Sequence, residues 1–443
     1  MKKGRKLLSL GTIKGHLGFL LLSNLPLVAL AQQPESQDPT ENSGGVIQRY
    51  GRNAATNLDS VLAQPNTVPL LQNYSSVSDE VLQNPPDSDW LTWRRSYDNH
   101  GFSNLDQINR QTVADLQLAW HQPVTQGNNM PTPLVHDGIM FLYSAGDVVL
   151  ALDATDGNLL WRYSHSGGDV TSHKFGIALH ENKVLVPTSD LHMVALDART
   201  GAVIWDHAID VGDNTGYQLR SAPTVAKGQV IQGMAASFVS GGGFIFAIDL
   251  ETGKETWHFY TLARPKEPGG NTWNNMPLED RQGGSVWNTG AYDPELDLVF
   301  YGASPTYNTG PLLYPLDIDG VSNDALYTNT TLALRPATGE LVWHFQHIAN
   351  DQFDLDWSFE RSIIELEIDG DLKKVVVTAG KPGVFDALNA ETGDYLFSVD
   401  PGLQNIFSSI NPLTGEKIEM TSIIPNGTIN PQIDYLPANS VTE

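Results

Sequence analysis

The sequence predicts an all-β protein, a β-propeller whose blades have four strands each. The main observation is an eleven-residue motif that begins with Ala, has Gly at its seventh place and ends on a large aromatic residue. Its spacing is typical of propeller blades, and its five copies begin at Ala151, Ala195, Ala247, Ala333 and Ala387. Short hairpin patterns precede the first three copies, and 40 Gly and 26 Pro in 443 residues suit a fold with many turns.

Each copy of the motif reads as the end of one strand, a tight turn and a second strand. The turn glycines, of which Gly157 is the first, stand where a short hairpin needs a residue with positive φ. An Asp in three copies can turn a side-chain oxygen back onto the turn backbone; these are Asp153, Asp197 and Asp249. The final aromatic residue, Trp in four copies and Phe397 in the fifth, is placed to pack against the next unit.

Residues 1–31 read as a cleavable signal peptide, with a basic start, an apolar stretch and a small-x-small cleavage site at Ala29–Ala31. A membrane anchor is the alternative, but the apolar stretch is short and contains Asn24 and Pro26. The expected location is therefore the periplasm, with no membrane span after cleavage. Removing residues 1–31 takes five of the 26 basic residues and none of the 51 acidic ones, which leaves a net charge of −30. Nucleic acid and anionic membranes are poor partners for such a chain.

The chain contains no cysteine. An exported protein of this size can rely on its core rather than on disulfides. The absence excludes a lipoprotein anchor, a thiolate metal site and covalent haem attachment through C-x-x-C-H within these residues.

In chain order, residues 32–88 read as a loose polar arm, and residues 89–443 as the propeller domain. Thr112–Leu118 has room for about one helical turn, and Leu116–Trp120 alternates as a strand does. Hairpins are expected around the turns at 136–138, 181–183 and 227–228.

The second half of the chain departs from the even repeat. Leu262–Asp280 is an insertion rich in Pro, Gly and Asn, and such long loops often carry sites. A sixth repeat starts at Ile410, and no further strand pair follows it. The sequence thus holds five to six blades' worth of chain, and we expect a ring that is incomplete at the C-terminus.

Four segments together resemble the quinoprotein alcohol dehydrogenases, the family of methanol and ethanol dehydrogenases that depend on pyrroloquinoline quinone (PQQ). They are the repeats themselves, residues 93–120, residues 283–302 and residues 342–357. The resemblance implies an eight-bladed propeller with PQQ on its axis beside a metal ion. Eight blades need more chain than is present, so the resemblance also implies a divergent and truncated member.

Three residues match positions of the family's cofactor site. Trp287 matches the tryptophan on which the quinone stacks, and a flat indole suits a planar cofactor. Asp354 matches the catalytic aspartate, which takes the hydroxyl proton as hydride leaves the alcohol. Lys381 matches the basic residue beside the quinone oxygens. The structural alternatives are a blade tryptophan, a solvated acidic turn and an exposed turn lysine.

The resemblance also implies a metal site in which Asp354, Asp356 and Ser304 are the candidate ligands. If residues 354–356 are extended, both carboxylates share one face, and two carboxylates favour Ca²⁺ or a lanthanide over zinc or copper. The family's metal-binding glutamate is missing from Gly233–Gly243, and Ser304 stands where the family has asparagine.

The leading hypothesis is a periplasmic PQQ-dependent dehydrogenase that oxidises a small alcohol and passes electrons to a separate cytochrome c. One alternative is a non-catalytic propeller of similar repeats that acts as a protein-binding scaffold in the cell envelope. A weaker alternative is a carbohydrate-active propeller that uses paired carboxylates such as Asp351 and Asp354.

Overall fold

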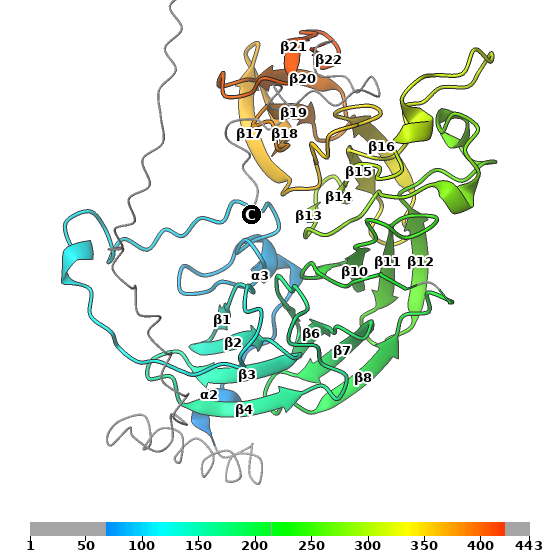
Figure 1. Ribbon diagram of the computed structural model, residues 1–443. Helices are drawn as coiled ribbons and strands as arrows, with labels where there is room; N and C mark the ends of the chain where they lie inside the picture. Colours follow the sequence, from blue (N-terminus) through cyan, green and yellow to red (C-terminus); the bar gives the residue numbers. More distant parts are fainter. Residues whose placement is uncertain (1–67, 214, 421–443) are drawn as a thin grey trace, which may run out of the picture. The chain divides into compact units, whose positions relative to one another are not determined.

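Five four-stranded antiparallel sheets follow one another along the chain in the computed structural model, which describes residues 68–213 and 215–420 (Figure 1). Within each sheet the strands pair in sequence order. The strands are β1 (Leu134–His136), β2 (Ile139–Ser144), β3 (Val148–Asp153) and β4 (Leu159–Ser164); β5 (Ala178–His180), β6 (Lys183–Pro187), β7 (His192–Asp197) and β8 (Val203–Ala208); β9 (Thr224–Ala226), β10 (Gln229–Met234), β11 (Phe244–Asp249) and β12 (Glu255–Tyr260); β13 (Ala291–Asp293), β14 (Leu298–Ala303), β15 (Thr330–Leu334) and β16 (Leu341–Gln346); β17 (Ser362–Ile368), β18 (Asp371–Ala379), β19 (Phe385–Asn389) and β20 (Tyr395–Val399). The predicted all-β propeller of four-stranded units is confirmed.

The motif forms the hairpin between the third and fourth strand of each sheet, as its chemistry predicts. In the first sheet Gly157 has φ +73°, and the carboxylate of Asp153 accepts hydrogen bonds from the backbone N–H and the hydroxyl of Thr155. Ala151 pairs with Trp161, and a bulge follows at once. The same pairing of Ala with the final aromatic residue occurs in all five sheets.

Tryptophan side chains join each sheet to the next one. Trp161 donates its indole N–H to the Ala198 carbonyl at 2.9 Å, and a Cβ atom added at Gly201 would lie 2.7 Å from the indole ring. The same contact recurs at three later boundaries, made by Trp205, Trp257 and Trp343. The expectation for the fifth copy is wrong, because Phe397 is 37% exposed and Tyr395 lies against the next glycine instead. Glycine is required at these turns because any side chain would displace an indole.

Replacing Gly201 with Ala is therefore expected to lower the free energy of unfolding by about 2–3 kcal/mol, from left-handed backbone strain and overpacking together. Gly212→Ala is the matched control, because Gly212 also has positive φ but nothing lies within 4 Å of an added Cβ. Urea denaturation of both variants separates the two causes. Equal decreases in the free energy of unfolding of both variants would show that crowding against Trp161 contributes nothing to the effect.

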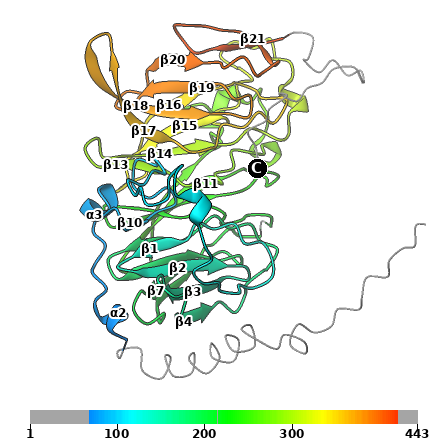
Figure 2. The same ribbon diagram turned by 90° about the vertical axis from the view of Figure 1, so that its left-hand side faces the viewer.

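The segment from residue 68 to residue 99 packs against the sheets, with the two short helices α2 (Pro69–Gln72) and α3 (Asp79–Gln83) along one edge (Figure 2). Its side chains enter the main core cluster; they are Leu71, Tyr74, Val77, Leu82 and Leu91. The expectation of a loose arm up to residue 88 is thus wrong for residues 68–88, because apolar side chains spaced too irregularly to form a pattern are buried there. The rest of the expected arm and the signal peptide lie outside the described residues.

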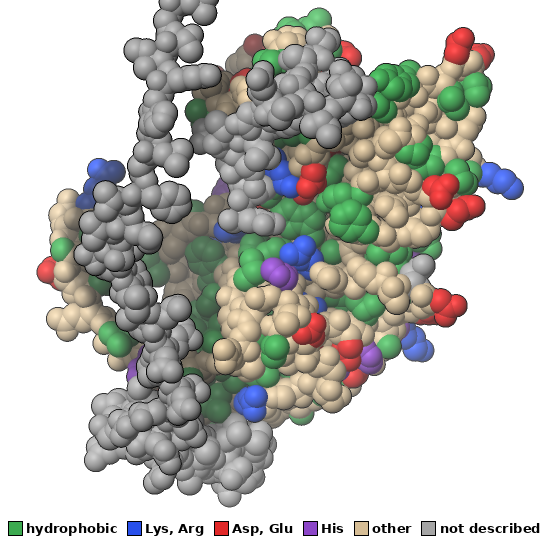
Figure 3. Space-filling view, viewed as in Figure 1, with side chains coloured by type: hydrophobic (Ala, Val, Ile, Leu, Met, Phe, Trp, Pro, Cys, Tyr) green, Lys and Arg blue, Asp and Glu red, His purple; other side chains and the backbone are tan. Residues whose placement is uncertain are grey.

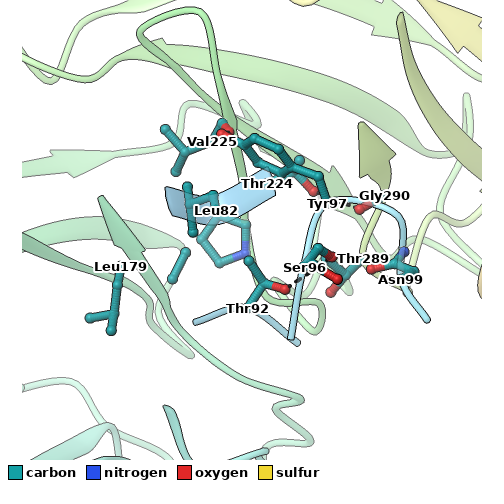
Figure 4. Close-up of a pocket in the computed structure, with 12 residues that line it drawn as sticks. Leu82, Thr92, Ser96, Tyr97, Asn99, Leu179, Thr224, Val225, Thr289 and Gly290 are labelled. Carbon is teal, nitrogen blue, oxygen red and sulfur yellow. Dashed lines mark hydrogen bonds between the residues drawn. The ribbon is translucent and has the colours of Figure 1, made fainter. Parts of the chain in front are cut away.

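This segment, which we call the N-terminal tie (residues 68–99), contacts all five sheets. Backbone bridges join it to the first and second sheets, at Trp90–Val135 and Val77–Glu181. The Tyr97 hydroxyl lies 2.8 Å from the Val225 carbonyl of the third sheet, and two backbone hydrogen bonds reach the fourth and fifth sheets. Figure 4 shows the tie packed against residues of the second and third sheets and of the segment just before β13, around a cavity of about 20 Å³, room for about one water molecule.

Residues 100–133 form a long exposed loop, drawn in cyan in Figure 1. It contains the 3₁₀ turn η2 (Val113–Asp115) where about one helical turn is expected. Leu116–Trp120 is not a strand, so that expectation is wrong for the described structure, in which these residues have no neighbouring strand. Three further 3₁₀ turns lie in later loops, η3 (Gly270–Thr272), η4 (Leu278–Asp280) and η5 (Gly310–Leu312). Within residues 68–213 and 215–420, no helix is long and apolar enough to cross a membrane.

The sixth repeat forms a two-stranded sheet, β21 (Phe407–Ile410) and β22 (Lys417–Glu419). The structure thus describes five complete sheets and two strands of another, as the sequence predicts. The insertion after the third sheet folds over buried Trp273 and Met276. Buried Arg281 ties it together by donating hydrogen bonds to three backbone carbonyls, those of Ala263, Gly270 and Met276.

Candidate cofactor site

Trp287 lies in the segment between the third and fourth sheets, next to the end of β10. The preceding residue, Val286, donates its N–H to the Met234 carbonyl, which fixes this segment along the sheet. The indole ring of Trp287 is half-buried and is flanked by Phe175 at 6.0 Å and by Phe359 at 5.1 Å, the latter ring perpendicular to it. Trp287 is therefore not one of the tryptophans that join the sheets.

The loop after β16 carries the acidic residues, and its backbone is unusual. Asn350, Asp354 and Asp356 all have positive φ, at 50°, 60° and 42°. Buried Asp351 holds the loop together, because its carboxylate accepts hydrogen bonds from Phe353 N–H, Leu355 N–H and the Asn329 amide. Burial raises the pKa of Asp351 to about 6 in spite of these donors. Left-handed backbone at non-glycine residues is costly and often marks a functional site.

Asp356 faces Trp287 from this loop. Its carboxylate accepts hydrogen bonds from the Trp287 indole N–H at 3.3 Å and from the N–H and hydroxyl of Ser358 at 3.0 and 2.9 Å. The side chain is buried, and burial raises its pKa although the Ser358 donors oppose that shift. Asp356 is thus a buried anchor that joins the acidic loop to the indole.

Asp354 faces outward and meets Lys381. The Lys381 ammonium lies 3.1 Å from an Asp354 carboxylate oxygen, and 49% of the Asp354 side chain is exposed. The Lys381 N–H donates to the backbone carbonyls of Leu355 and Asp356, so the lysine loop is fastened to the acidic loop. The structure therefore brings together Trp287, Asp356, Asp354 and Lys381. The expectation of an extended segment with both carboxylates on one face is wrong. The left-handed backbone directs the Asp356 side chain into the protein and the Asp354 side chain towards solvent.

Trp357 forms the floor below this group. It is fully buried, and a Cβ atom added at Gly380 would lie 2.5 Å from its ring, so the loop that carries Lys381 rests directly on the indole. His347 also stacks parallel to the Trp357 ring at 5.5 Å, and the Lys417 ammonium lies 4.9 Å from the ring. The position of Lys381 therefore depends on a stack that reaches into the sixth sheet.

His347 belongs to a fully buried polar network. Its Nδ1 lies 2.6 Å from the Asp386 carboxylate, its Nε2 lies 2.7 Å from the Thr331 hydroxyl, and Lys417 lies 2.7 Å from the same carboxylate. Burial lowers the pKa of His347 to about 4. Burial acts to raise the pKa of Asp386, but hydrogen bonds from His347 and Lys417 outweigh it and hold that pKa low.

The neutral state of His347 predicts a loss of stability in acid. The pKa of His347 in the folded protein lies below the ordinary value of 6.5. The free energy of unfolding is therefore highest above pH 6.5 and decreases as the pH falls towards 4, because the unfolded chain binds the proton more readily. The expected loss of unfolding free energy over this window is about 3 kcal/mol. Urea denaturation from pH 7 to pH 4 measures it, and His347→Gln should flatten the profile. An equally steep decline in that variant would contradict the role of His347.

Ser304 is not part of the acidic group. It is fully buried, its hydroxyl accepts the N–H of Ser285, and it forms backbone hydrogen bonds with Ser285 and Asn329. No described group of three or more His, Asp or Glu residues could hold a metal ion. The structure thus offers two carboxylates, Asp354 and Asp356, and gives Ser304 a structural position between strands.

Two aromatic residues that the sequence analysis missed are Tyr307, which lies beside Asp354, and Phe238, which contacts Tyr307. The Tyr307 hydroxyl is 3.4 Å from its carboxylate, and the ring of Tyr307 contacts Phe238, which is 73% exposed. In the sequence these two residues are marked by position alone. Phe238 lies within Gly233–Gly243, which lacks the family's glutamate, and Tyr307 lies three residues after Ser304, which replaces the family's asparagine. Figure 3 shows one face of the molecule, with hydrophobic side chains gathered near its centre and basic and acidic groups beside them.

An indole, two carboxylates and an ammonium meet between loops of a propeller whose sheets are joined by tryptophans, an arrangement expected of a quinoprotein. The chain belongs to the family of PQQ-dependent alcohol dehydrogenases: the family model described as "glucose/ethanol/alcohol dehydrogenase, beta-propeller domain" matches residues 90–429. The dehydrogenase subunit of the quinone alcohol dehydrogenase of Gluconacetobacter polyoxogenes is 35% identical over an alignment of 356 positions, which covers 74% of this chain and 48% of that protein.

Solved structures agree with this assignment. The quinohemoprotein alcohol dehydrogenase ADH-IIG of Pseudomonas putida HK5 matches with a TM-score of 0.72 at 30% identity, over 81% of this chain and 55% of that chain. A europium-containing methanol dehydrogenase matches with a TM-score of 0.65 at 26% identity, over 77% and 63%. The chain spans about half the length of the curated relatives it matches. The match to dehydrogenases favours the enzyme interpretation over the scaffold.

Proposed function

We propose that this chain binds PQQ and takes part in the oxidation of a small alcohol. The observation that carries the proposal is the convergence of Trp287, Asp356, Asp354 and Lys381 from three separate segments, in a chain whose family is defined by alcohol dehydrogenases. A half-buried indole offers an apolar face to a planar ring system, and exposed polar groups lie beside it. The residues present therefore fit a planar cofactor with polar oxygens.

The roles of the side chains follow from their surroundings. PQQ, when bound, supplies a two-electron acceptor for the hydride of the alcohol. Asp354 is the proposed base, because its carboxylate is accessible and can take the hydroxyl proton. Lys381 orients that carboxylate through the ion pair at 3.1 Å and offers further donors to a bound anion. Asp356 fixes the indole through the hydrogen bond to its N–H.

The described residues do not form a complete cation site. Ca²⁺ takes about six to eight oxygen ligands, and two carboxylates are too few to form such a site by themselves. We therefore derive no step through a metal, and calcium or a lanthanide enters as a condition of the binding experiment. The europium-containing relative makes a lanthanide worth including.

Export to the periplasm and electron transfer to a separate cytochrome c complete the proposal. Residues 1–31 have the pattern of a cleavable signal. A cytochrome c is the proposed acceptor because the similar proteins include quinohemoprotein alcohol dehydrogenases and a lupanine 17-hydroxylase named with cytochrome c.

PQQ binding tests the site directly. Quenching of tryptophan fluorescence by PQQ is measured with calcium, with lanthanum and with a chelator. Trp287→Ala should raise Kd at least about tenfold, a loss of about 1.4 kcal/mol, whereas Trp287→Phe should retain most of the affinity because a flat ring remains. Tyr314→Ala, at an exposed aromatic outside the group, is the control. Absence of saturable binding under all three conditions would overturn the proposed function.

A further inference from the structure

A cleft of about 420 Å³ lies at the edge of the third sheet, along its outermost strand β12 (Figure 1). Its walls come from β12 itself, from residues 210–217 after β8, from residues 240–244 at the start of β11 and from the insertion that follows β12. None of the residues of the candidate cofactor site lines it. Its volume lies in the range of small-molecule sites, about 300–1,000 Å³. We call it the β12 cleft.

Aromatic rings form one wall of the β12 cleft. Phe244 and His258 stack with their ring centroids 5.0 Å apart and their planes at 18°. Tyr217 packs by its edge on Phe244 at 5.6 Å, and Tyr260 lies 6.2 Å from both stacked rings. The Tyr217 hydroxyl donates to the Gly242 carbonyl at 3.2 Å, which fixes its ring. Such a wall offers ring faces and ring edges to a planar aromatic ligand.

The guanidinium of Arg264 lies beside this wall without a counter-ion. It is 3.9 Å from the centroid of the Tyr260 ring, and its Nη1 donates to the Gly241 carbonyl at 2.7 Å. Among the described residues no carboxylate forms an ion pair with this guanidinium, and the Glu267 carboxylate accepts the Arg264 backbone N–H instead. Burial lowers the pKa of Arg264, because the charge is partly removed from water. The group is therefore held in place while several of its five N–H donors remain free.

A second guanidinium without a carboxylate partner lies near the first. The Arg281 side chain is buried and donates to three backbone carbonyls. Its own carbonyl accepts the Gly241 N–H at 2.9 Å, next to the carbonyl that Arg264 binds. Burial, and then the charge of Arg264, lower the pKa of Arg281 to about 10. Two neighbouring cations that no described carboxylate neutralises favour an anion in the cleft, in a chain whose net charge is −25.

Two acidic residues restrict the kind of anion. Asp210 and Glu279 line the cleft and are exposed. Repulsion from their carboxylates disfavours a multiply charged anion more than a singly charged one. The aromatic wall adds that the anion should carry a flat apolar ring. A single carboxylate on an aromatic ring meets both conditions.

We propose that the β12 cleft binds a small aromatic monocarboxylate. Its carboxylate accepts hydrogen bonds from the free donors of Arg264, in the forked geometry that guanidinium and carboxylate groups share. Its ring packs against Tyr217, Phe244 and Tyr260. The inference is independent of the proposed function, because no residue of the cofactor site takes part in it.

Benzoate is the probe, titrated into the full chain by isothermal titration calorimetry. We expect saturable one-to-one binding with a Kd of about 1 mM or lower. Benzamide has the ring without the charge, and cyclohexanecarboxylate has the charge without a flat ring. Each should bind at least about threefold more weakly, and inorganic phosphate should not displace benzoate. Absence of saturable binding, equal binding of either analogue, or displacement by phosphate would each overturn the proposal.

Arg264→Met removes the guanidinium but keeps an aliphatic stem, and it should weaken benzoate binding at least about tenfold. Arg162→Met is the matched control, because Arg162 is an exposed arginine on β4, the outermost strand of the first sheet. It should bind benzoate as the unmodified chain does. Lys381→Met should also bind normally, and a loss in that variant would assign benzoate to the cofactor site and overturn the proposal.

A second variant guards against disruption of the loop at Gly241, whose carbonyl Arg264 binds. Arg264→Lys keeps a cation in the cleft but lacks the planar fork. It should weaken benzoate binding at least about threefold, with an unchanged midpoint of urea denaturation. Benzoate binding that neither Arg264 variant weakens would show that the ligand lies elsewhere.

Discussion

Replacing Asp354 with Asn is expected to lower the rate of alcohol-dependent dye reduction by the PQQ-loaded protein by about 10²–10⁴-fold, the usual contribution of a positioned base. An amide has nearly the shape of a carboxylate but cannot take the hydroxyl proton. Asn also tolerates the left-handed backbone of this residue, at φ 60°, so the loop should keep its conformation. The measurement is single-turnover reduction by short alcohols, together with PQQ binding by fluorescence quenching.

Asp369→Asn is the matched control, since Asp369 is an exposed aspartate with φ 57° in the turn between β17 and β18. It should change neither turnover nor binding. In Asp354→Asn, PQQ affinity should change by less than about tenfold, because the stacking surface is intact. A turnover loss below about threefold would remove Asp354 from the role of base.

The second large effect concerns stability. Lys417→Met is expected to lower the free energy of unfolding by about 3–5 kcal/mol, the usual cost of removing one partner from a buried ion pair. Both side chains are fully buried, and the ammonium lies 2.7 Å from the Asp386 carboxylate. Without Lys417, that carboxylate keeps its hydrogen bonds from His347 and Ser398 but loses the one permanently charged partner that it has among the described residues.

Two further measurements identify the cause. Lys417→Met combined with Asp386→Asn should recover most of the loss, because the unpaired charge is removed. Lys417 also lowers the pKa of His347, so in the single variant that pKa should rise and the protonated imidazole should partly replace the ammonium in mild acid. A double variant no more stable than Lys417→Met would show that packing on Trp357, and not charge, causes the loss.

The repeated part of the fold could be predicted because its signals are local. Glycine with positive φ, aspartate bonded to its own turn and alternating apolar residues each act within a few positions, and the hairpins lie at the expected turns. The packing of residues 68–88 could not be predicted in the same way. Their burial depends on contacts with residues more than about sixty positions away in the sequence. Such contacts produce no periodic pattern of apolar residues from which they could be predicted.

The site was predictable only in part. The resemblance identified Trp287, Asp354 and Lys381, and the structure brings them together. The resemblance could not reveal the left-handed backbone at Asp354 and Asp356, which depends on the buried carboxylate of Asp351. The network of His347, Asp386 and Lys417 joins three sheets, and isolated charged residues far apart in sequence carry no signal that they will meet.

The N-terminal tie has a consequence for cooperativity. A linear array of repeats in which each unit contacts only its neighbours can fray from one end, because every boundary opens independently. Here one short segment is hydrogen-bonded to the first, second, third, fourth and fifth sheets. Opening any boundary therefore strains contacts with the others. The tie converts a series of separate nearest-neighbour equilibria into one shared transition, so the five sheets should exchange their amide protons as a single unit rather than as a sequence of steps.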